Sequence, residues 1–272
     1  MIAMNGSYHG KSMGALSITF NPKYRKSFQP LVDGVTFSPF GDIESLRSKI
    51  DDNTGFIVLE PIQGESGIHV APDGFLQDVR KICDENDILL IFDEIQTGLG
   101  RTGRMWASEH WNTVPDILCI AKGIAGGVPM GVTMVRPDIL GCINKGEHSS
   151  TFGGNPLSCA AGTATLQALT QDGLIDNAEK MGKIFSTGLE SLKEKHNVIR
   201  EIRGKGLMIG IELKFEVRDI LMEGIEKNLL LLYSGRNILR LLPPLVITEQ
   251  DVTKSLEILD ELLTNEEKRR NG

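Results

Sequence analysis

The stretch Ile88-Leu89-Leu90-Ile91-Phe92-Asp93-Glu94 decides the fold class, because a run of apolar residues leads directly into two carboxylic acids. Such a short apolar run is typical of a strand buried on both faces of a parallel sheet. Similar runs occupy residues 55–59 and 117–121, and a helical pattern over residues 74–85 separates the first of them from Ile88. This order of strand, helix and strand predicts an α/β fold with a mostly parallel sheet.

The pattern changes after residue 155. Residues 156–196 read as two long helices or one bent helix, broken near Asp172-Gly173. From residue 197 apolar segments flank Arg203-Gly204-Lys205-Gly206, and an amphipathic helix follows at residues 252–263. We expect a large α/β domain over residues 1–196 and a smaller α+β domain over residues 197–272. The charged residues 265–272 are expected to fray.

The composition is that of a globular protein with a sizeable core, since 40% of the 272 residues are hydrophobic and 24% are charged. The net charge of −7 comes from interspersed acids and bases, which gives no sign of nucleic-acid binding. We find neither a membrane-spanning run nor a signal-peptide pattern, so we expect no membrane partner and a cytoplasmic location. Four widely spaced cysteines predict reduced thiols, without disulfides or a metal site.

Two side chains at strand ends carry the chemistry. Asp93 ends a buried strand, where open α/β sheets bind their ligands. It could pair with a protonated ring nitrogen such as that of pyridoxal 5'-phosphate (PLP), or it could cap a helix or form a structural ion pair. Lys122 follows the next strand and precedes several glycines. Its amine could react with the cofactor aldehyde and shuttle a proton, although a lysine before glycine is usually a surface residue. Both side chains should face one crevice.

Four ordered motifs resemble those of class III aminotransferases, most closely the acetylornithine, ornithine and carrier-protein-linked lysine aminotransferases. They are Glu60–Glu65, Asp93–Gly103, Lys122-Gly123 and Ser150–Pro156. The resemblance implies the PLP-dependent transferase fold type I. It also implies transamination between a terminal-amine substrate and 2-oxoglutarate or glutamate, in arginine or lysine biosynthesis. N-acetylornithine is favoured over carrier-bound lysine, and ornithine or another ω-amino acid is the alternative.

Carried over residue by residue, the resemblance implies a cofactor site made of Tyr8, Asp93, Glu94, Ile95, Gln96, Lys122 and Thr151. Lys122 would hold PLP covalently, and Asp93 would pair with the pyridine nitrogen. Gln96 would lie near the ring hydroxyl, and Tyr8 would stack on the ring. Thr151 would reach the cofactor phosphate of a partner subunit, which implies a homodimer with shared active sites.

The resemblance also implies a substrate site. Arg240 would bind the substrate α-carboxylate with its planar fork of donors. Glu65 would mask Arg240 while an amine donor is bound and release it for glutamate, and Ser150 would lie beside the substrate. Lys11 stands where these families usually carry arginine, so it supplies charge without bidentate geometry. Glu60 is expected to be structural.

A departure from the family concerns the N-terminus. These families begin about a hundred residues earlier, with a loop and helix N-terminus that hold the cofactor phosphate. We therefore expect the chain to be N-terminally incomplete. The alternative to an active enzyme is a non-catalytic fragment that keeps the fold but lacks this loop.

A nucleotide hydrolase is a rival from another enzyme class. Residues 5–12 nearly match a phosphate-binding P-loop, and residues 89–94 resemble the acidic strand that helps to hold magnesium. However, Asn5 replaces the first glycine of the P-loop pattern. This hypothesis also leaves Lys122 and Arg240 without a role, so the aminotransferase interpretation is preferred.

Overall fold

The computed structural model describes residues 1–271 and divides the chain into two compact units. Unit 1 comprises residues 1–61, 71–99 and 106–172, and unit 2 comprises residues 62–70, 100–105 and those from 173 onward. This division differs from the expected boundary at residue 196. Helix α7 (Leu174–Lys195) belongs to unit 2 because it packs on helix α9 (Glu249–Asn271) and strand β9 (Ile199–Lys205) of that unit.

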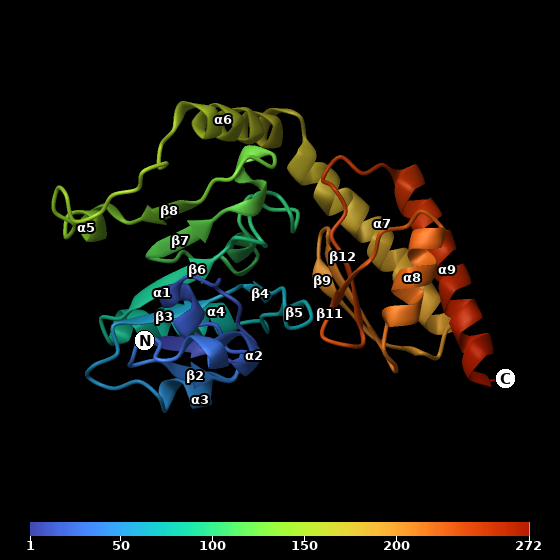
Figure 1. Ribbon diagram of the computed structural model, residues 1–272, viewed down its shortest axis with the longest axis horizontal. Helices are drawn as coiled ribbons and strands as arrows, with labels where there is room; N and C mark the ends of the chain where they lie inside the picture. Colours follow the sequence, from blue (N-terminus) through green and yellow to red (C-terminus); the bar gives the residue numbers. More distant parts are fainter. Residues whose placement is uncertain (272) are drawn as a thin grey trace. The chain divides into compact units, whose positions relative to one another are not determined.

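Unit 1 is built on a six-stranded sheet in the order β2-β1-β3-β6-β7-β8 (Figure 1). The strands are β1 (Ile2–Met4), β2 (Thr36–Ser38), β3 (Phe56–Leu59), β6 (Leu89–Asp93), β7 (Ile117–Ile120) and β8 (Val132–Val135). The first five are parallel, and only β8 at the edge runs antiparallel. The predicted α/β class with a mostly parallel sheet is therefore confirmed.

The helices of unit 1 connect and flank these strands. They are α1 (Met13–Ser17), α2 (Pro22–Arg25), α3 (Ile43–Arg47), α4 (Phe75–Glu85), α5 (Pro137–Leu140) and α6 (Pro156–Gln171), with 3-10 turns η1 (Lys26–Phe28), η2 (Ala107–Trp111) and η3 (Lys122–Ala125). Helix α4 buries Phe75, Leu76, Val79 and Ile82 on one stripe, as the helical periodicity of residues 74–85 predicts.

Asp116, immediately before β7, links several elements of unit 1. Its side chain is 2% exposed. It forms ion pairs with Arg80 of α4 at 2.8 Å and with Arg136, which follows β8, at 2.6 Å. The backbone N–H of Leu90 in β6 also donates to it at 2.6 Å. A buried carboxylate is tolerated here because it is paired on several sides, and the pairing fixes β6, β7 and β8 against α4.

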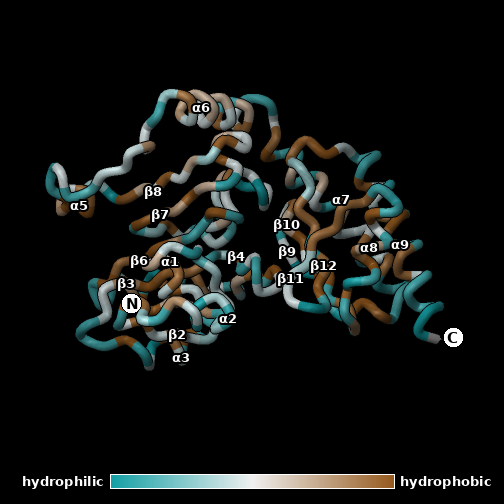
Figure 2. The backbone as a smooth tube through the Cα atoms, in the orientation of Figure 1, coloured by the Kyte–Doolittle hydropathy of each residue, from teal (hydrophilic) through white to brown (hydrophobic). Residues whose placement is uncertain are grey.

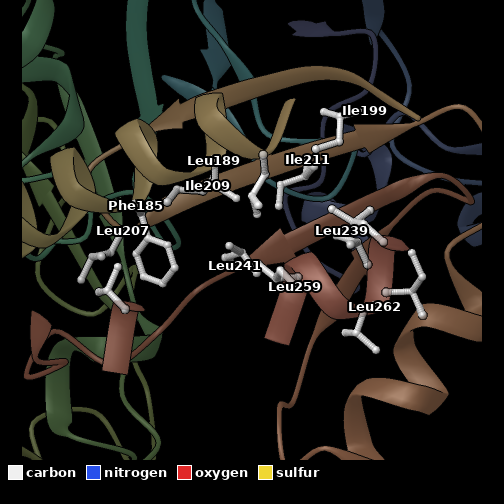
Figure 3. Packing of buried hydrophobic residues seen from close by; sticks show 14 of the residues in the cluster. Phe185, Leu189, Ile199, Leu207, Ile209, Ile211, Leu239, Leu241, Leu259 and Leu262 are labelled. Carbon is white, nitrogen blue, oxygen red and sulfur yellow. The ribbon is translucent and has the colours of Figure 1, made fainter. Parts of the chain in front are cut away.

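Unit 2 contains a four-stranded antiparallel sheet in the order β11-β12-β10-β9. Its further elements are β4 (Ile62–Gln63), β5 (His69–Val70), β10 (Met208–Leu213), β11 (Leu232–Ser234), β12 (Ile238–Leu241) and α8 (Arg218–Glu226). Figure 3 shows Ile209 and Ile211 of β10 and Leu239 and Leu241 of β12 in the buried cluster, together with Phe185 and Leu189 of α7 and Leu259 and Leu262 of α9. One face of the sheet is therefore covered by helices.

The opposite face of this sheet carries the alternate residues of the same strands, since side chains alternate along a strand. Gly210 of β10 stands opposite Arg240 of β12 and opposite Arg203 of β9. A Cβ atom on Gly210 would come within 3.0 Å of Ile68. The β4–β5 hairpin, residues 62–70, therefore packs closely on this second face.

The fraying expected for the C-terminal residues is not found over residues 265–271, because α9 continues to Asn271. Gly272 lies outside the described residues. Nε of Arg270 forms an ion pair with Oε1 of Glu266 at 2.6 Å, and the Arg270 guanidinium lies 3.9 Å from the centre of the Phe215 ring. Arg269 pairs with Glu223 of α8 at 2.9 Å. Charged side chains thus hold the last turns through ion pairs and ring contacts.

The described cysteines are all free thiols. Cys83 is buried, and this burial raises its pKa to about 12, which makes it a poor nucleophile. Cys142 is exposed, so its thiol does not serve as a small buried hydrophobic group. Within residues 1–271, no helix has the length and apolar character needed to cross a bilayer, and no cluster of potential metal ligands occurs.

Candidate active site

The carboxyl ends of β1, β3, β6 and β7 lie along one edge of the unit 1 sheet, since these strands are parallel neighbours. From β1 the chain passes to β2 on one side and then to β3 on the other. This reversal creates the kind of switch point at which open α/β sheets bind ligands. Asp93 ends β6, and the segments that follow β1, β3 and β7 carry Tyr8, Glu60 and Lys122.

Asp93 is the last residue of β6 and is only 6% exposed. Its Oδ2 atom lies 2.8 Å from Nδ1 of His9, and its Oδ1 atom accepts the backbone N–H of Ile95 at 3.0 Å. A carboxylate has no hydrogen to donate, so Nδ1 of His9 carries the hydrogen in this bond. These two donors fix the direction in which the Asp93 carboxylate points.

His9 is itself anchored in the loop after β1 by burial and hydrogen bonds. Its side chain is 3% exposed, and its backbone N–H donates to Oγ1 of Thr19 at 2.9 Å. The sequence patterns assign no role to His9, although it neighbours Tyr8. The sheet topology could have pointed to His9, since parallel strands bring the loop after β1 to the same edge of the sheet as the end of β6.

Glu94 is fully buried, and its carboxylate is occupied within its own loop. It accepts the backbone N–H groups of Ala107 at 2.7 Å and Ser108 at 2.8 Å, and the Thr97 hydroxyl at 3.0 Å. Burial raises the pKa of Glu94, and the hydrogen bonds from Ser108 and Ala107 oppose this rise. The geometry therefore assigns the Glu94 side chain to holding the loop around residues 94–108.

Gln96 and Tyr8 lie in the loops that follow β6 and β1. The Oε1 atom of Gln96 is buried and has no hydrogen-bond partner among the described residues. Buried polar atoms are normally paired, so this atom marks a place where a polar ligand group would fit. The backbone N–H of Tyr8 donates to Oε1 of buried Glu60 at 3.0 Å, which supports the structural role expected for Glu60.

Lys122 follows β7 in a left-handed backbone conformation, with φ of 48°. A residue with a Cβ atom seldom adopts this conformation, which costs of order 1–3 kcal/mol and is concentrated at functional sites. Cys119 of β7 pairs in register with Asp93 of β6. Lys122 and Asp93 thus extend from the same ends of neighbouring strands, as the sequence predicts.

Ser150 and Thr151 belong to the exposed loop that precedes α6. Ser150 lines a cavity of about 340 Å³ together with Met130, Phe152 and Asn155. Lys11 is exposed, and its Nζ atom lies 5.3 Å from the centre of the Tyr24 ring. A larger cavity of about 570 Å³, lined by residues that include Trp106, Asn112 and Met134, contains none of the predicted site residues.

Unit 2 brings together the two residues predicted to control the substrate carboxylate. Nη1 of Arg240 lies 2.7 Å from Oε1 of Glu65. The Arg240 side chain is 11% exposed and that of Glu65 is 39% exposed. The buried Nε of Arg240 has no hydrogen-bond partner among the described residues. The guanidinium therefore keeps donor capacity beyond its pair with Glu65.

The profile of the family described as aminotransferase class III matches residues 1–263. The chain belongs to this family, whose members are PLP-dependent enzymes. It is 48% identical to an acetylornithine aminotransferase of Caldanaerobacter subterraneus over 97% of the chain and 67% of the relative. It is 42% identical to ornithine aminotransferase 1 of Staphylococcus saprophyticus over 97% of the chain and 66% of that protein.

Solved structures agree with this membership. The ornithine aminotransferase of Toxoplasma gondii, described with partial occupancy of PLP at its active site, superposes with a TM-score of 0.96 at 34% identity. The match covers 100% of this chain and 65% of that one. The class III chain therefore has the fold expected from its motifs, and it spans about two thirds of the length of these relatives.

The residues at the strand ends of unit 1 fit the chemistry of PLP. The buried Asp93 carboxylate, oriented by His9, suits a protonated pyridine nitrogen. The unpaired Gln96 oxygen suits a polar substituent of the ring, allowing for the two orientations of a side-chain amide. Lys122 would supply the amine, and its positive φ fixes the direction in which that side chain leaves the backbone.

Proposed function

We propose that this chain carries out PLP-dependent transamination between a terminal-amine substrate and 2-oxoglutarate. The observation that carries the proposal is the buried Asp93–His9 pair at 2.8 Å, on the strand next to the one that ends before Lys122. A surface lysine and a capping aspartate would not require this arrangement. The names of the acetylornithine and ornithine aminotransferases among the relatives support the same reaction class.

In the proposed mechanism PLP, when bound, supplies an aldehyde that reacts with amines and a cationic ring that accepts electrons. Asp93 keeps the ring nitrogen protonated, and His9 and Ile95 hold the carboxylate in position. Nζ of Lys122 would hold the cofactor and would act as the acid–base group that moves a proton at the amine-bearing carbon of the substrate. Gln96 would contact the ring hydroxyl, Tyr8 would cover the ring, and Ser150 would lie beside the substrate.

For the substrate we propose N-acetylornithine first, with carrier-bound lysine next and ornithine as the alternative. With these substrates we propose a role in arginine or lysine biosynthesis, and we propose a cytoplasmic location. One relative named for acetylornithine and one named for ornithine are each 42% identical in sequence to this chain. Arg240 would bind a substrate carboxylate, and Glu65 would mask Arg240 when an amine donor lacks the second carboxylate of glutamate.

Borohydride reduction tests the proposed cofactor site directly. The purified chain is mixed with PLP, its absorbance spectrum is recorded, and the reduced protein is mapped by peptide mass spectrometry. We expect one dominant label at Lys122, because it follows β7, the strand next to the one that ends in Asp93. Exposed Lys81 serves as the internal measure of background labelling. Labelling at Lys122 no stronger than at Lys81 would contradict the proposal.

We also propose that two copies form a dimer through the surface of α6 and the loop before it. Helix α6 contains no charged residue, and Figure 2 draws it mostly in white and brown. Leu157 of α6 is 72% exposed and Phe152 is 81% exposed. An exposed helix surface that carries apolar side chains and no charges favours association. This surface adjoins Thr151, the residue proposed to reach the partner's cofactor phosphate.

Sedimentation velocity tests the dimer. We expect twice the chain mass of 29.8 kDa and dissociation of the Leu157→Glu variant, because a charge would be buried in an apolar contact. Lys81→Glu is the matched control, since Lys81 is 71% exposed on α4. A monomer in the unsubstituted chain, or equal behaviour of the two variants, would overturn this surface as the interface.

A further inference from the structure

The loop that carries Glu65 is fastened to the sheet of unit 2 at several points. Ser234, the last residue of β11, donates its Oγ hydrogen to the backbone oxygen of Glu65 at 2.5 Å and lies 3.4 Å from that of Gly64. Ser234 is 3% exposed. A buried hydroxyl in this position has one hydrogen to donate, and the shorter contact shows that Glu65 receives it.

Register explains why Ser234 reaches this loop. Ser234 pairs with Ile238 of β12, and Ile238 is two residues from Arg240. Side chains two residues apart along a strand share a face, so Ser234 and Arg240 are on the face covered by the β4–β5 hairpin. One end of Glu65 is therefore held by Ser234, while its carboxylate pairs with Arg240 at 2.7 Å.

We propose that Ser234 is a positioning residue that holds the main chain of Glu65 beside Arg240 and thereby sets how often Arg240 is masked. This inference rests on the proposed function, in which Arg240 binds a substrate carboxylate. With the main chain fixed, the Glu65 side chain moves on and off Arg240 by rotation about its own bonds. The 39% exposure of that side chain gives it room to rotate.

Other contacts hold a different part of the loop. Nε of Arg203 donates to the backbone oxygen of Gly67 at 2.7 Å. A Cβ atom on Gly67, whose φ is +134°, would come within 2.5 Å of Ile238. These contacts fasten the loop two residues after Glu65 and keep the hairpin in place when the Ser234 hydroxyl is removed. Ser234→Ala therefore loosens Glu65 without releasing the whole loop.

The direction of the effect follows from what Arg240 does in each half of the reaction. A looser Glu65 masks Arg240 less often, so a dicarboxylate meets the open guanidinium more often. An amine donor that needs Arg240 masked loses affinity for the same reason. Opposite changes for the two substrates separate this role from general damage to unit 2, which would weaken both.

The experiment compares Ser234→Ala with Ser234→Thr, which retains the hydroxyl, in the full chain with PLP. For Ser234→Ala we expect a KM for 2-oxoglutarate that falls and a KM for N-acetylornithine that rises, each about two- to tenfold, the range of one net hydrogen bond. The changes should lie in KM rather than in kcat. Ser234→Thr should restore the original ratio.

A second readout does not depend on turnover. Calorimetric titration with glutarate, a dicarboxylate without a reacting carbonyl, should show tighter binding to Ser234→Ala than to the unsubstituted chain. If Ser234→Ala does not fold, Ser234→Cys provides the same comparison with a weak donor. Equal changes for both substrates, or unchanged glutarate binding, would overturn the positioning role. Failure of Lys122 labelling would instead count against the proposed function, so the two failures are distinguishable.

Discussion

Replacement of Lys122 by alanine is expected to abolish the borohydride-fixed PLP label and to reduce transamination by roughly 10²- to 10⁴-fold or more, the range of a positioned acid–base group. The loss is large because one amine would both hold the cofactor and move the proton. Peptide mapping and the rate of 2-oxoglutarate consumption measure the two effects separately.

Two variants separate the amine of Lys122 from its charge. Lys122→Arg keeps a cation, but a guanidinium stays protonated and does not replace an amine nucleophile, so it should fail as alanine does. Lys81→Ala removes an exposed lysine of α4 and should leave both readouts unchanged, since an exposed (i, i+4) ion pair contributes little. A persistent label in Lys122→Ala would sink the assignment of Lys122.

Asp93→Asn is expected to keep the fold and to lower turnover by about 10- to 150-fold. An asparagine oxygen still accepts hydrogen from Nδ1 of His9 or from the N–H of Ile95, which preserves the packing around β6. The neutral amide, however, no longer stabilises a protonated ring nitrogen. Hydrogen bonds to charged groups contribute about 1.5–3 kcal/mol, which corresponds to the quoted loss.

The measurement is the half-reaction with glutamate, followed by the absorbance of the bound cofactor, with circular dichroism as the test of folding. Asp52→Asn changes an exposed loop residue in the same way and is the matched control. Unchanged turnover in a folded Asp93→Asn protein would remove Asp93 from its proposed role. Loss of the fold would instead point to a structural role for the Asp93–His9 pair.

The sequence located β3, β6 and β7 and helices α4 and α6 of unit 1, because their patterns are local. The apolar runs at residues 55–59, 88–92 and 117–121 correspond closely to β3, β6 and β7, and the helical stretch at residues 74–85 corresponds to α4. The break near Asp172-Gly173 separates α6 from α7. The expected fraying of residues 265–271 was wrong, because ion pairs between distant residues hold α9. Gly272 lies outside the described residues.

The sequence by itself determined the fold class and the residue types at the strand ends, including Asp93 and Lys122, since both follow from local apolar runs and what comes next. Only the tertiary structure decided that His9 orients Asp93 across 84 residues and that Ser234 holds Glu65 across 169 residues. Strand order and register create these hydrogen bonds, and both are set by packing between segments far apart in the chain. Local periodicity carries no information about which strands become neighbours.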